Sequence, residues 1–409
     1  MQIKVSAPDV LHASIDLPSS KSISNRVLII NALAQGEFIP QNLSDCDDTS
    51  VMIKALNSAE NVMDIMAAGT AMRFLTAYLS VSSGDKIITG TKRMQQRPIQ
   101  ILVDALRELG ADIEYIGTEG FPPLRIKGST LSGGDITMKG SVSSQYISAL
   151  LMIAPLLKDG LRLCLSGEIV SKPYINLTLK LMKDFGANAE WVSDSLINVE
   201  SKSYISRPFV VESDWSAASY WYQMVALSQK AEVELLGLFA DSYQGDCKVA
   251  EIFEHLGVTT TFTKKGVILS KTAITAKTLD YDFVEQPDLA QTFVVTCALL
   301  GIPFRFSGLQ SLKIKETDRI AALIKEMSKL GYLLKEENDS VLYWNSEYKM
   351  PDVIPAIDTY EDHRMAMAFA PAIIRHPNLL IADPQVVTKS YPGYWEDLKQ
   401  AGFQVINEG

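Results

Sequence analysis

A chain of 409 residues with 47% hydrophobic content exceeds what one hydrophobic core usually organises, so we expect two domains. A formal net charge of −10 argues against a general nucleic-acid binder, and any anion-binding site must therefore be local. The start lacks the apolar run of a signal peptide, and the longest apolar stretch, 146–157, is too short to span a bilayer. We therefore expect a soluble, cytoplasmic protein with no membrane partner, in which four scattered cysteines stay reduced.

Paired amphipathic helices recur along the chain. The first helix of each pair is expected to begin near Ser22, Thr70, Ser144, Ser216, Asp288 and Asp362. The second ends at Gly110, Gly186, Gly257, Gly331 and Gly402, where glycine supplies a left-handed cap, and 49–57 is a weaker sixth example. Short alternating runs such as 161–165 and 341–344 predict strands between the helices. The pattern predicts an αβ unit of roughly 70 residues in six copies, three per domain, with a break at 208–214.

Basic residues gather at the expected helix starts, where the helix dipole disfavours a cation by up to about 1 kcal/mol. A bound phosphate or carboxylate would offset this cost, because backbone N–H groups and basic side chains would face the same anion. One exposed lysine or arginine needs no such explanation. Repetition at equivalent positions predicts a shared site for small anions, and symmetric packing of the units would bring the helix starts together in the cleft between the domains.

Asp288 and Glu316 are the carboxylates among these cations that we single out for proton transfer. Asp288 is equally typical of a helix cap, and Glu316 of an intrahelical ion pair. The four histidines have no metal-ligand spacing, and the chain has neither a glycine-rich phosphate loop nor a nucleophile elbow. We therefore expect a reaction without a metal or a cofactor.

Seven segments, in register over essentially the whole chain, resemble the 5-enolpyruvylshikimate-3-phosphate synthase family. They are LPSSKSISNR at 17–26, GTAMR at 69–73, RPI at 97–99, VSSQ at 142–145, VSKPY at 170–174, KETDR at 315–319 and DHRMAM at 362–367. Seven short motifs in the right order are far more specific than any one of them.

The resemblance implies an α/β (α+β) fold of two similar domains, each built from three βαβαββ units, of the inside-out α/β barrel type. One domain would hold residues 20–211, and the other residues 1–19 plus 212–409. The active site would lie in the interdomain cleft, whose closure would exclude water from a reactive intermediate. A monomer is expected.

The resemblance also implies a reaction of the shikimate pathway, which leads to chorismate and the aromatic amino acids. The enolpyruvyl group of phosphoenolpyruvate would pass to the 5-hydroxyl of shikimate 3-phosphate through a tetrahedral intermediate, with release of phosphate. Shikimate 3-phosphate would contact Lys21, Ser22, Arg26, Ser143, Ser144, Ser171, Asp288, Ser311 and Lys315. Phosphoenolpyruvate would contact Lys21, Gly69, Arg97, Gln145, Arg319, Arg364 and Lys389. Asp288 would deprotonate the hydroxyl, Glu316 would exchange the proton at the methylene carbon, and Lys21 would assist either step.

Three positions depart from the family pattern. Met66-Ala67-Ala68 stands where Gly-Asn-Ala or Gly-Asn-Ser is common, Phe74 replaces a common proline, and Ser311 stands where asparagine is frequent. We expect a lost polar contact near phosphoenolpyruvate, which bears on the affinity for this substrate and for the inhibitor glyphosate.

Two other functions remain open. A related enolpyruvyl transferase acts on UDP-N-acetylglucosamine, but it normally carries a cysteine in the loop before the Arg-Pro pair, and 90–98 has none. The other is a catalytically silent anion-binding homologue that serves as a regulator or scaffold. The presence of both Asp288 and Glu316 weighs against it.

Overall fold

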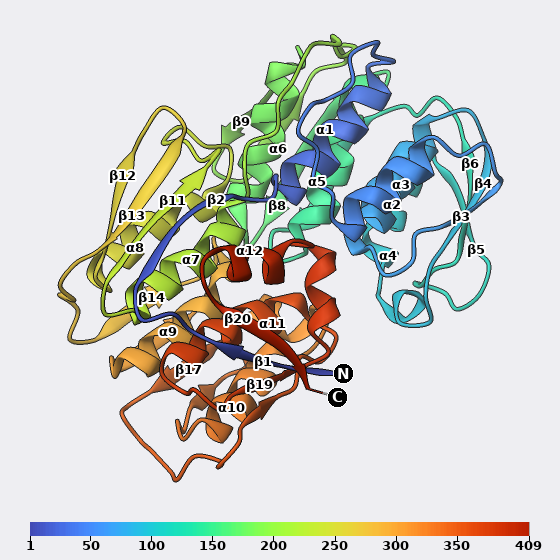
Figure 1. Cartoon of the computed structure of the whole chain (residues 1–409). Coiled ribbons are helices and arrows are strands. Elements are labelled where there is room, and N and C mark those ends of the chain that lie inside the picture. The colour runs from blue at the N-terminus through green and yellow to red at the C-terminus, as the bar shows by residue number, and fades with distance from the viewer. Residues whose placement is uncertain (409) are drawn as a thin grey trace. The chain divides into compact units, whose positions relative to one another are not determined.

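Four-stranded sheets of one topology recur along the chain (Figure 1). The structure is a computed structural model that describes residues 1–408, apart from the side chain of Ile314. Its sheets have the strand orders β3-β4-β6-β5, β7-β8-β10-β9, β2-β11-β13-β12, β14-β15-β17-β16 and β18-β19-β1-β20. In each sheet the first two strands are parallel and the other neighbours are antiparallel. This is the βαβαββ unit that the resemblance implied.

The chain forms two compact units, and the first, Ser19–Val211, is continuous in sequence. We call it the continuous unit. It begins with α1 (Lys21–Leu33) and α2 (Asp47–Leu56). Its first sheet unit comprises β3 (Val62–Asp64), α3 (Gly69–Val81), β4 (Gly84–Thr89), η1 (Met94–Gln96), α4 (Gln100–Glu108), β5 (Asp112–Tyr115) and β6 (Leu124–Gly128). Its second comprises β7 (Gly134–Lys139), α5 (Ser144–Ile153), η2 (Ala154–Leu156), β8 (Leu161–Ser166), α6 (Lys172–Asp184), β9 (Ala189–Ser193) and β10 (Leu196–Val199).

The second unit joins Met1–Pro18 to the chain from Glu212 onward, and we call it the split unit. One sheet unit comprises β2 (Leu11–Asp16), α7 (Trp215–Leu227), β11 (Ala231–Leu236), η3 (Gly245–Lys248), α8 (Val249–His255), β12 (Val258–Phe262) and β13 (Gly266–Lys271). The next comprises β14 (Leu279–Asp282), η4 (Pro287–Leu289), α9 (Ala290–Leu300), β15 (Phe304–Ser307), η5 (Gln310–Ile314), α10 (Arg319–Lys329), β16 (Lys335–Glu337) and β17 (Val341–Trp344). The last comprises β18 (Ala356–Ile357), α11 (His363–Phe369), η6 (Ala370–Ile374), β19 (Leu380–Ala382), η7 (Pro384–Lys389), α12 (Tyr394–Gln400), β20 (Gln404–Glu408) and β1 (Gln2–Ser6).

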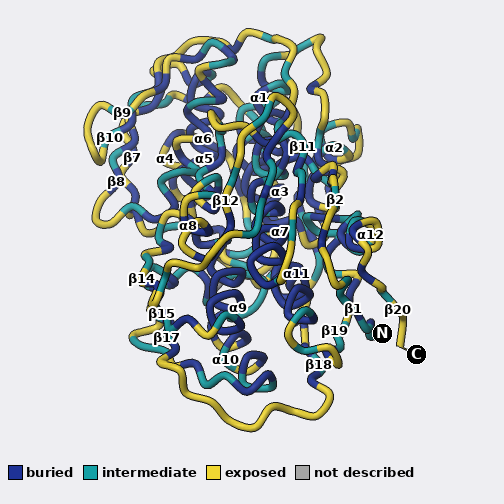
Figure 2. The backbone as a smooth tube through the Cα atoms, turned by 60° about the vertical axis from the view of Figure 1, so that its left-hand side comes forward, coloured by how far each residue is buried: buried dark blue, intermediate teal, exposed yellow. Residues whose placement is uncertain are grey.

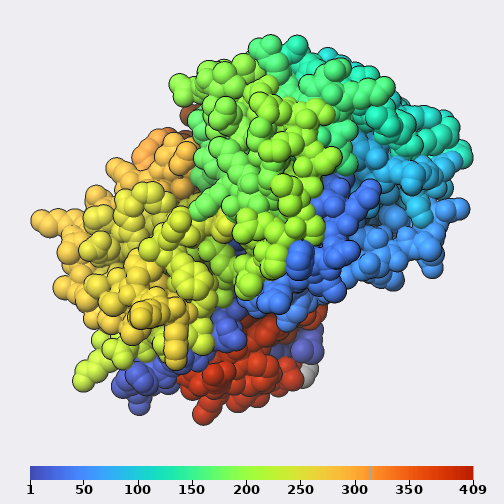
Figure 3. All heavy atoms as spheres, turned by 90° about the horizontal axis from the view of Figure 1, so that it is seen from above, coloured from blue at the N-terminus to red at the C-terminus, as the bar shows by residue number. Residues whose placement is uncertain are grey.

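The first two strands of the chain complete two sheets of the split unit. β2 pairs in parallel with β11, and β1 lies between β19 and β20. Figure 1 marks the two chain ends close together, and Figure 3 shows dark-blue N-terminal atoms against red C-terminal ones. Without these strands, two sheets would lose a member, so the N-terminal segment belongs to the fold of the split unit.

Helices form the interior of each unit, and the sheets cover it. All residues of α7 except Ser216 are buried, and α9 is buried over nearly its whole length. Strands such as β7 and β8 instead have buried residues mainly on one side and exposed or half-buried ones on the other (Figure 2). A helix that is buried on all sides can present polar chemistry only at its ends, and Asp288 lies just before α9.

The helix boundaries confirm the repeat. The first helices begin at Lys21, Gly69, Ser144, Trp215 and His363, and η4 with α9 begins at Pro287. The five capping glycines have positive φ, namely Gly110, Gly186, Gly257, Gly331 and Gly402. The copy with α1 and α2 differs. The only β pairing that we find next to these helices, within residues 1–408, is the bridge between Gln41 and Val210.

The structure bears on two expectations from the sequence, which concern membrane-spanning segments and the cysteines. Among the described residues, no helix combines the length and the apolar character that crossing a membrane requires. The four cysteines are free, with Cys46 and Cys297 buried and the other two partly so.

Candidate functional site

Arg319 is the centre of a charged cluster in the split unit. It is the first residue of α10, and its side chain is only 2% exposed. Its guanidinium binds Asp362 through Nε at 2.7 Å and Nη2 at 3.3 Å. It also donates to Asp288 at 3.2 Å and to Glu316 at 3.1 Å. Burial opposes the charge, but these three carboxylates outweigh it and raise the pKa of Arg319 above its ordinary value.

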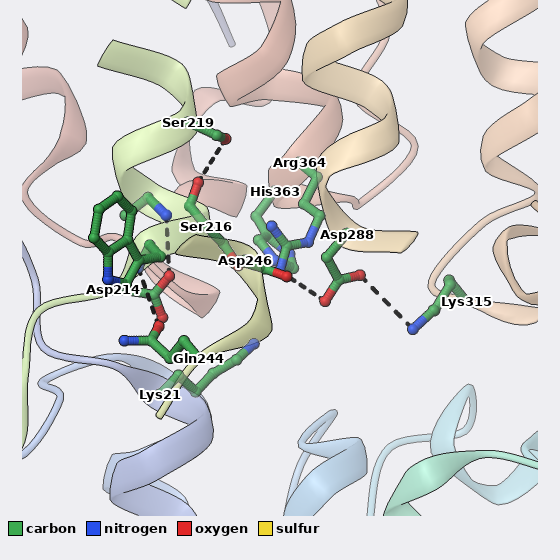
Figure 4. Close-up of polar contacts among 12 residues, drawn as sticks. Lys21, Asp214, Ser216, Ser219, Gln244, Asp246, Asp288, Lys315, His363 and Arg364 are labelled. Atoms are coloured by element: carbon green, nitrogen blue, oxygen red, sulfur yellow. Dashed lines mark hydrogen bonds and ion pairs between the residues drawn. The ribbon is translucent and has the colours of Figure 1, made fainter. Parts of the chain in front are cut away.

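Asp288 lies in η4, between three cations. Arg364 Nη2 donates to its Oδ2 at 2.9 Å, and Lys315 Nζ lies 3.7 Å from Oδ1. Figure 4 shows both side chains directed at the Asp288 carboxylate. The carboxylate therefore binds side-chain cations from three segments, and the alternative of a simple helix cap does not describe it, because the cap residue of α9 is Leu289.

Glu316 also bridges two cations. Lys389 Nζ donates to its Oε1 at 2.7 Å, while Arg319 binds Oε2. Its contact with Arg319 is local, but Glu316 precedes α10, so the pair is not the intrahelical one of the alternative interpretation. The contact with Lys389 joins residues far apart in sequence. Both candidate carboxylates thus share Arg319.

Lys315 and Arg364 are half-buried and buried members of the same cluster. Burial lowers the pKa of Lys315, an effect that Asp288 partly opposes. Arg364 lies in the first turn of α11, and its Nη1 contacts the Tyr220 hydroxyl at 3.3 Å. Burial is the main cause that raises the pKa of Tyr220 above its ordinary value, so the guanidinium donates to the oxygen of a neutral phenol.

A second cluster lies at the helix starts of the continuous unit, and Arg26 is its most buried cation. Its guanidinium donates to Thr178 Oγ1 at 2.7 Å, to Ser148 Oγ at 3.1 Å and to the Ser22 carbonyl at 2.9 Å. All three acceptors are uncharged, and no carboxylate pairs with Arg26 in the described part of the chain. Burial accordingly lowers its pKa to about 10. A buried cation without a counter-charge is costly, and a bound anion would offset that cost.

Gly69 and Arg97 fit against each other. A Cβ built on Gly69 would lie 2.6 Å from Arg97 Nη1 and 3.0 Å from Arg73 Nη1. Arg73 in turn donates to the Gly69 and Pro98 carbonyls. Glycine at the start of α3 therefore leaves the space in which two guanidinium groups lie beside a helix N-terminus.

The remaining predicted residues of the continuous unit begin helices. Lys21 is the first residue of α1, and its Nζ lies 3.5 Å from Asp48. Ser143 caps α5, Ser144 is its first residue, and Gln145 donates to Thr70 Oγ1 of α3 at 3.0 Å. Ser171 precedes α6 with a φ of 57°, a strained conformation for a residue that is not glycine. A side-chain contact thus links the starts of α3 and α5, and Arg26 joins α1 to Ser148 of α5 and Thr178 of α6.

Several predicted residues lie elsewhere than in the first turn of an α-helix, among them Arg26 in the second turn of α1 and Glu316 before α10. Arg97, Lys315 and Lys389 stand at or just after the ends of the short helices η1, η5 and η7. Ser311 lies within η5. The dipole argument for cations at helix starts therefore applies to Lys21, Arg319 and Arg364 but not to these, whose positions depend on tertiary contacts.

The structure also identifies residues that sequence reasoning did not select. Asp362 holds Arg319 and caps α11 through the Arg364 N–H at 2.8 Å. Asp48 is the partner of Lys21, and Thr178 is an acceptor for Arg26. An acidic residue in the first turn of a helix is common, so the sequence alone did not mark Asp48.

The departures from the family pattern have local consequences. Phe74 is buried and lies under the Arg26 guanidinium, 5.2 Å from ring centroid to Cζ. Met66 is exposed with a φ of 53°, and Ala68, the cap of α3, offers no side-chain hydrogen bond. Within residues 1–408, no group of three or more His, Cys, Asp or Glu residues could hold a metal ion.

Solved structures share this architecture. EPSP synthase from Acinetobacter baumannii superposes with a TM-score of 0.77 over 99% of this chain and 100% of that one, at 19% identity. The chain therefore has the α/β fold of two units that this class of protein adopts.

Sequence comparison identifies the family. The model of EPSP synthase (3-phosphoshikimate 1-carboxyvinyltransferase) matches residues 5–60 and 55–398. A 3-phosphoshikimate 1-carboxyvinyltransferase of Bacteroides fragilis is 65% identical over 99% of both chains. One of Vibrio cholerae is 36% identical over 96% of this chain and 97% of its own. The chain belongs to the EPSP synthase family.

Proposed function

We propose that this chain is a 3-phosphoshikimate 1-carboxyvinyltransferase. It transfers the enolpyruvyl group of phosphoenolpyruvate to the 5-hydroxyl of shikimate 3-phosphate and releases inorganic phosphate. The observation that carries the assignment is the 65% identity to the Bacteroides fragilis relative over 99% of both chains. The two cation clusters support it, because both ligands carry phosphate and carboxylate groups.

Asp288 is the proposed general base for the 5-hydroxyl. As the hydroxyl oxygen bonds to the enol carbon of phosphoenolpyruvate, its proton passes to Asp288. Arg319 and Arg364 hold the carboxylate from two sides, at 3.2 and 2.9 Å, and this fixed orientation suits a proton acceptor. Lys315, at 3.7 Å, neutralises charge beside it.

Glu316 is the proposed acid for the methylene carbon. It donates a proton there during addition, which turns the methylene into a methyl group and gives the tetrahedral intermediate. During elimination the C–O bond to phosphate breaks, and phosphate leaves with the electron pair and takes up the proton that Asp288 removed from the hydroxyl. Glu316 removes a methyl proton to restore the double bond, so both carboxyl groups return to their starting states. Its contacts with Lys389 and Arg319 set its orientation.

The cations have two proposed roles. Arg26, together with Lys21, Ser22, Ser143, Ser144, Ser171, Ser311 and Lys315, would hold shikimate 3-phosphate. Arg97, with Gly69, Gln145, Arg319, Arg364 and Lys389, would hold phosphoenolpyruvate. Guanidinium groups suit this task because each can bind two oxygens of a phosphate or carboxylate. Cations fixed before the reaction also stabilise the departing phosphate. Lys21 would assist the proton transfers.

Phosphate release by the purified protein tests the activity. With shikimate 3-phosphate and phosphoenolpyruvate we expect release, and with UDP-N-acetylglucosamine as acceptor we expect none. Asp288→Asn and Glu316→Gln should each lower kcat by roughly 10²- to 10⁴-fold. Asp9→Asn and Glu37→Gln, which change exposed carboxylates, are the matched controls and should leave the rate unchanged.

The other functions give distinct results. Release with UDP-N-acetylglucosamine alone would assign the chain to the related transferase. Binding of both phosphorylated ligands without release would identify a silent homologue. Exchange of the methylene hydrogens in D₂O distinguishes the roles of the two carboxylates, because Glu316→Gln should abolish this exchange.

We propose that the active species is a monomer, which light scattering of the purified protein would test.

A further inference from the structure

Asp246 is a buried carboxyl group next to the charged cluster of Arg319, Asp288 and Arg364. The proposed mechanism does not use it. It lies in η3 of the split unit and is 4% exposed. Ser216 Oγ donates a short hydrogen bond to its Oδ2. Its Oδ1 is buried and has no hydrogen-bond partner among the described residues. An ionised oxygen in such a place would lose its hydration without compensation, so the neutral acid is the favoured form.

The groups that face Asp246 come from several elements. They are Asp288 of η4, Arg364 of α11, Asp214 at the start of α7, and Tyr281 of β14, besides its own neighbour Cys247. Figure 4 draws Asp246 together with Ser216, Arg364 and Asp288. Burial is the largest cause that raises the pKa of Asp246, to about 7, and the charge of Asp288 adds to it. Ser216 and Arg364 act in the opposite direction.

We propose that Asp246 is a positioning residue for Asp288 and Arg364. In its neutral form it leaves the Arg364 guanidinium to Asp288 and to the anionic substrate, and in its ionised form it competes for that guanidinium. This inference rests on the proposed function, since it assigns Arg364 to phosphoenolpyruvate. Asp246 does not touch the reacting atoms, and it acts only through its two neighbours.

The physical basis is charge balance. Arg364 donates to the Asp288 carboxylate at 2.9 Å, so part of its charge is already offset. A second negative charge nearby offsets more of the field that attracts an anion, and it raises the electrostatic cost of bringing a phosphate or carboxylate to the same place. Binding of phosphoenolpyruvate should therefore weaken as Asp246 ionises. KM for phosphoenolpyruvate should rise with this ionisation, and kcat should change less than KM.

The test is the pH profile of KM for phosphoenolpyruvate in phosphate release, from pH 6 to 9. In the unsubstituted enzyme, KM should rise by roughly 3- to 10-fold as the pH passes through neutrality. Asp246→Asn, which has the same shape and cannot ionise, should remove this rise. Ser216→Ala should move it to higher pH, because the hydrogen bond that favours the ionised form is lost. Asp9→Asn is the exposed control.

Ionisation of phosphoenolpyruvate itself affects KM equally in the unsubstituted enzyme and in each variant. Its effect therefore cancels when the KM profiles are compared. A KM profile of Asp246→Asn that matches the unsubstituted enzyme would overturn the proposal. So would a flat profile in the unsubstituted enzyme. A merely structural role would change stability and leave the shape of the profile as it was.

A measurement without substrate separates this inference from the proposed function. The unfolded chain ionises Asp246 near its ordinary pKa of 3.8, whereas the folded protein holds the proton until about pH 7. The folded state binds more protons in this window, so the stability contributed by Asp246 falls as the pH rises from about 4 to about 7. The Tm of Asp246→Asn relative to the unsubstituted protein should therefore rise across that window and then level off. A Tm difference that does not change with pH would contradict a neutral Asp246 in the folded protein, even if the enzyme were inactive.

Discussion

At the scale of single residues, the candidate site requires a small residue where a larger side chain would clash with a neighbouring cation. Gly69 is the clearest case, because its missing Cβ is the space that Arg97 occupies. The same position begins α3, where free N–H groups favour an anion. A glycine here serves the packing of a cation, which is a different task from the capping glycines at positive φ.

We predict that Gly69→Ala displaces Arg97 and weakens phosphoenolpyruvate binding. A Cβ 2.6 Å from Arg97 Nη1 requires the guanidinium to move. KM for phosphoenolpyruvate should rise by about 10-fold or more, as expected when about 1.4 kcal/mol of binding energy is lost. KM for shikimate 3-phosphate should change less. Gly393→Ala, where the nearest atom lies 3.8 Å from the new Cβ, is the matched control. Equal effects of the two substitutions would contradict the prediction.

Arg26 gives a second prediction at this scale. Its partners Thr178 and Ser148 are neutral, so its charge is held without a counter-ion. Arg26→Met should relieve that cost and raise the Tm, while it abolishes binding of shikimate 3-phosphate. Calorimetric titration and thermal unfolding of the same variant measure the two effects. A fall in Tm together with unchanged binding would show that Arg26 serves packing alone.

At the scale of elements, helix starts hold both capping contacts and several of the proposed site residues. Asp362 illustrates the combination, since one carboxylate caps α11 and holds the buried Arg319 of α10. Two helices from consecutive sheet units of the split unit are thus joined by one buried ion pair. The contact also fixes the guanidinium that Asp288 and Glu316 share.

Asp362→Ala should therefore destabilise the protein by about 3–5 kcal/mol, because it leaves Arg319 without its closest buried partner. Asp318→Ala is a matched control, since Asp318 caps α10 through the Ala321 N–H but is less buried. The control should cost only about 1 kcal/mol. Denaturant unfolding of both variants measures the difference, and equal losses would show that the ion pair adds nothing beyond the cap.

At the scale of the whole molecule, the order of the chain differs from the order of the sheets. The continuous unit contains all of its strands, whereas the split unit takes β1 and β2 from the N-terminus. β1 is antiparallel to β20, with Gln2 opposite Glu408, so the two chain ends meet at one end of a strand pair.

We expect a fragment of residues 19–211 to fold alone and residues 212–408 to fail, because the latter lack strands of two sheets. A permuted chain that runs from 212 to 408 and then, through a short turn, into 2–18 should recover the fold, since Gln2 and Glu408 are already paired. Circular dichroism and cooperative urea unfolding test all three. Cooperative folding of 212–408 without the N-terminal segment would show that β1 and β2 are dispensable.

Much of this molecule follows from the sequence. Helix periodicity and glycines at cap positions predicted the repeated units, because both are local properties of a few consecutive residues. Seven motifs predicted the family, and the βαβαββ topology agrees with it. The two carboxylates singled out as Asp288 and Glu316 are both found among cations, as expected.

Only the tertiary structure decided which charges meet. Asp288 and Arg364 are joined across 76 positions and Glu316 and Lys389 across 73, contacts that no local pattern encodes. The same holds for Arg26 among neutral hydroxyls and for the unpartnered oxygen of Asp246, since desolvation depends on everything that packs around a group. The sequence by itself determined the repeats and singled out the residues proposed for the chemistry, because both are recognised from short segments. Packing decided their partners and their burial, because Coulomb and desolvation energies depend on distances between segments far apart in the chain.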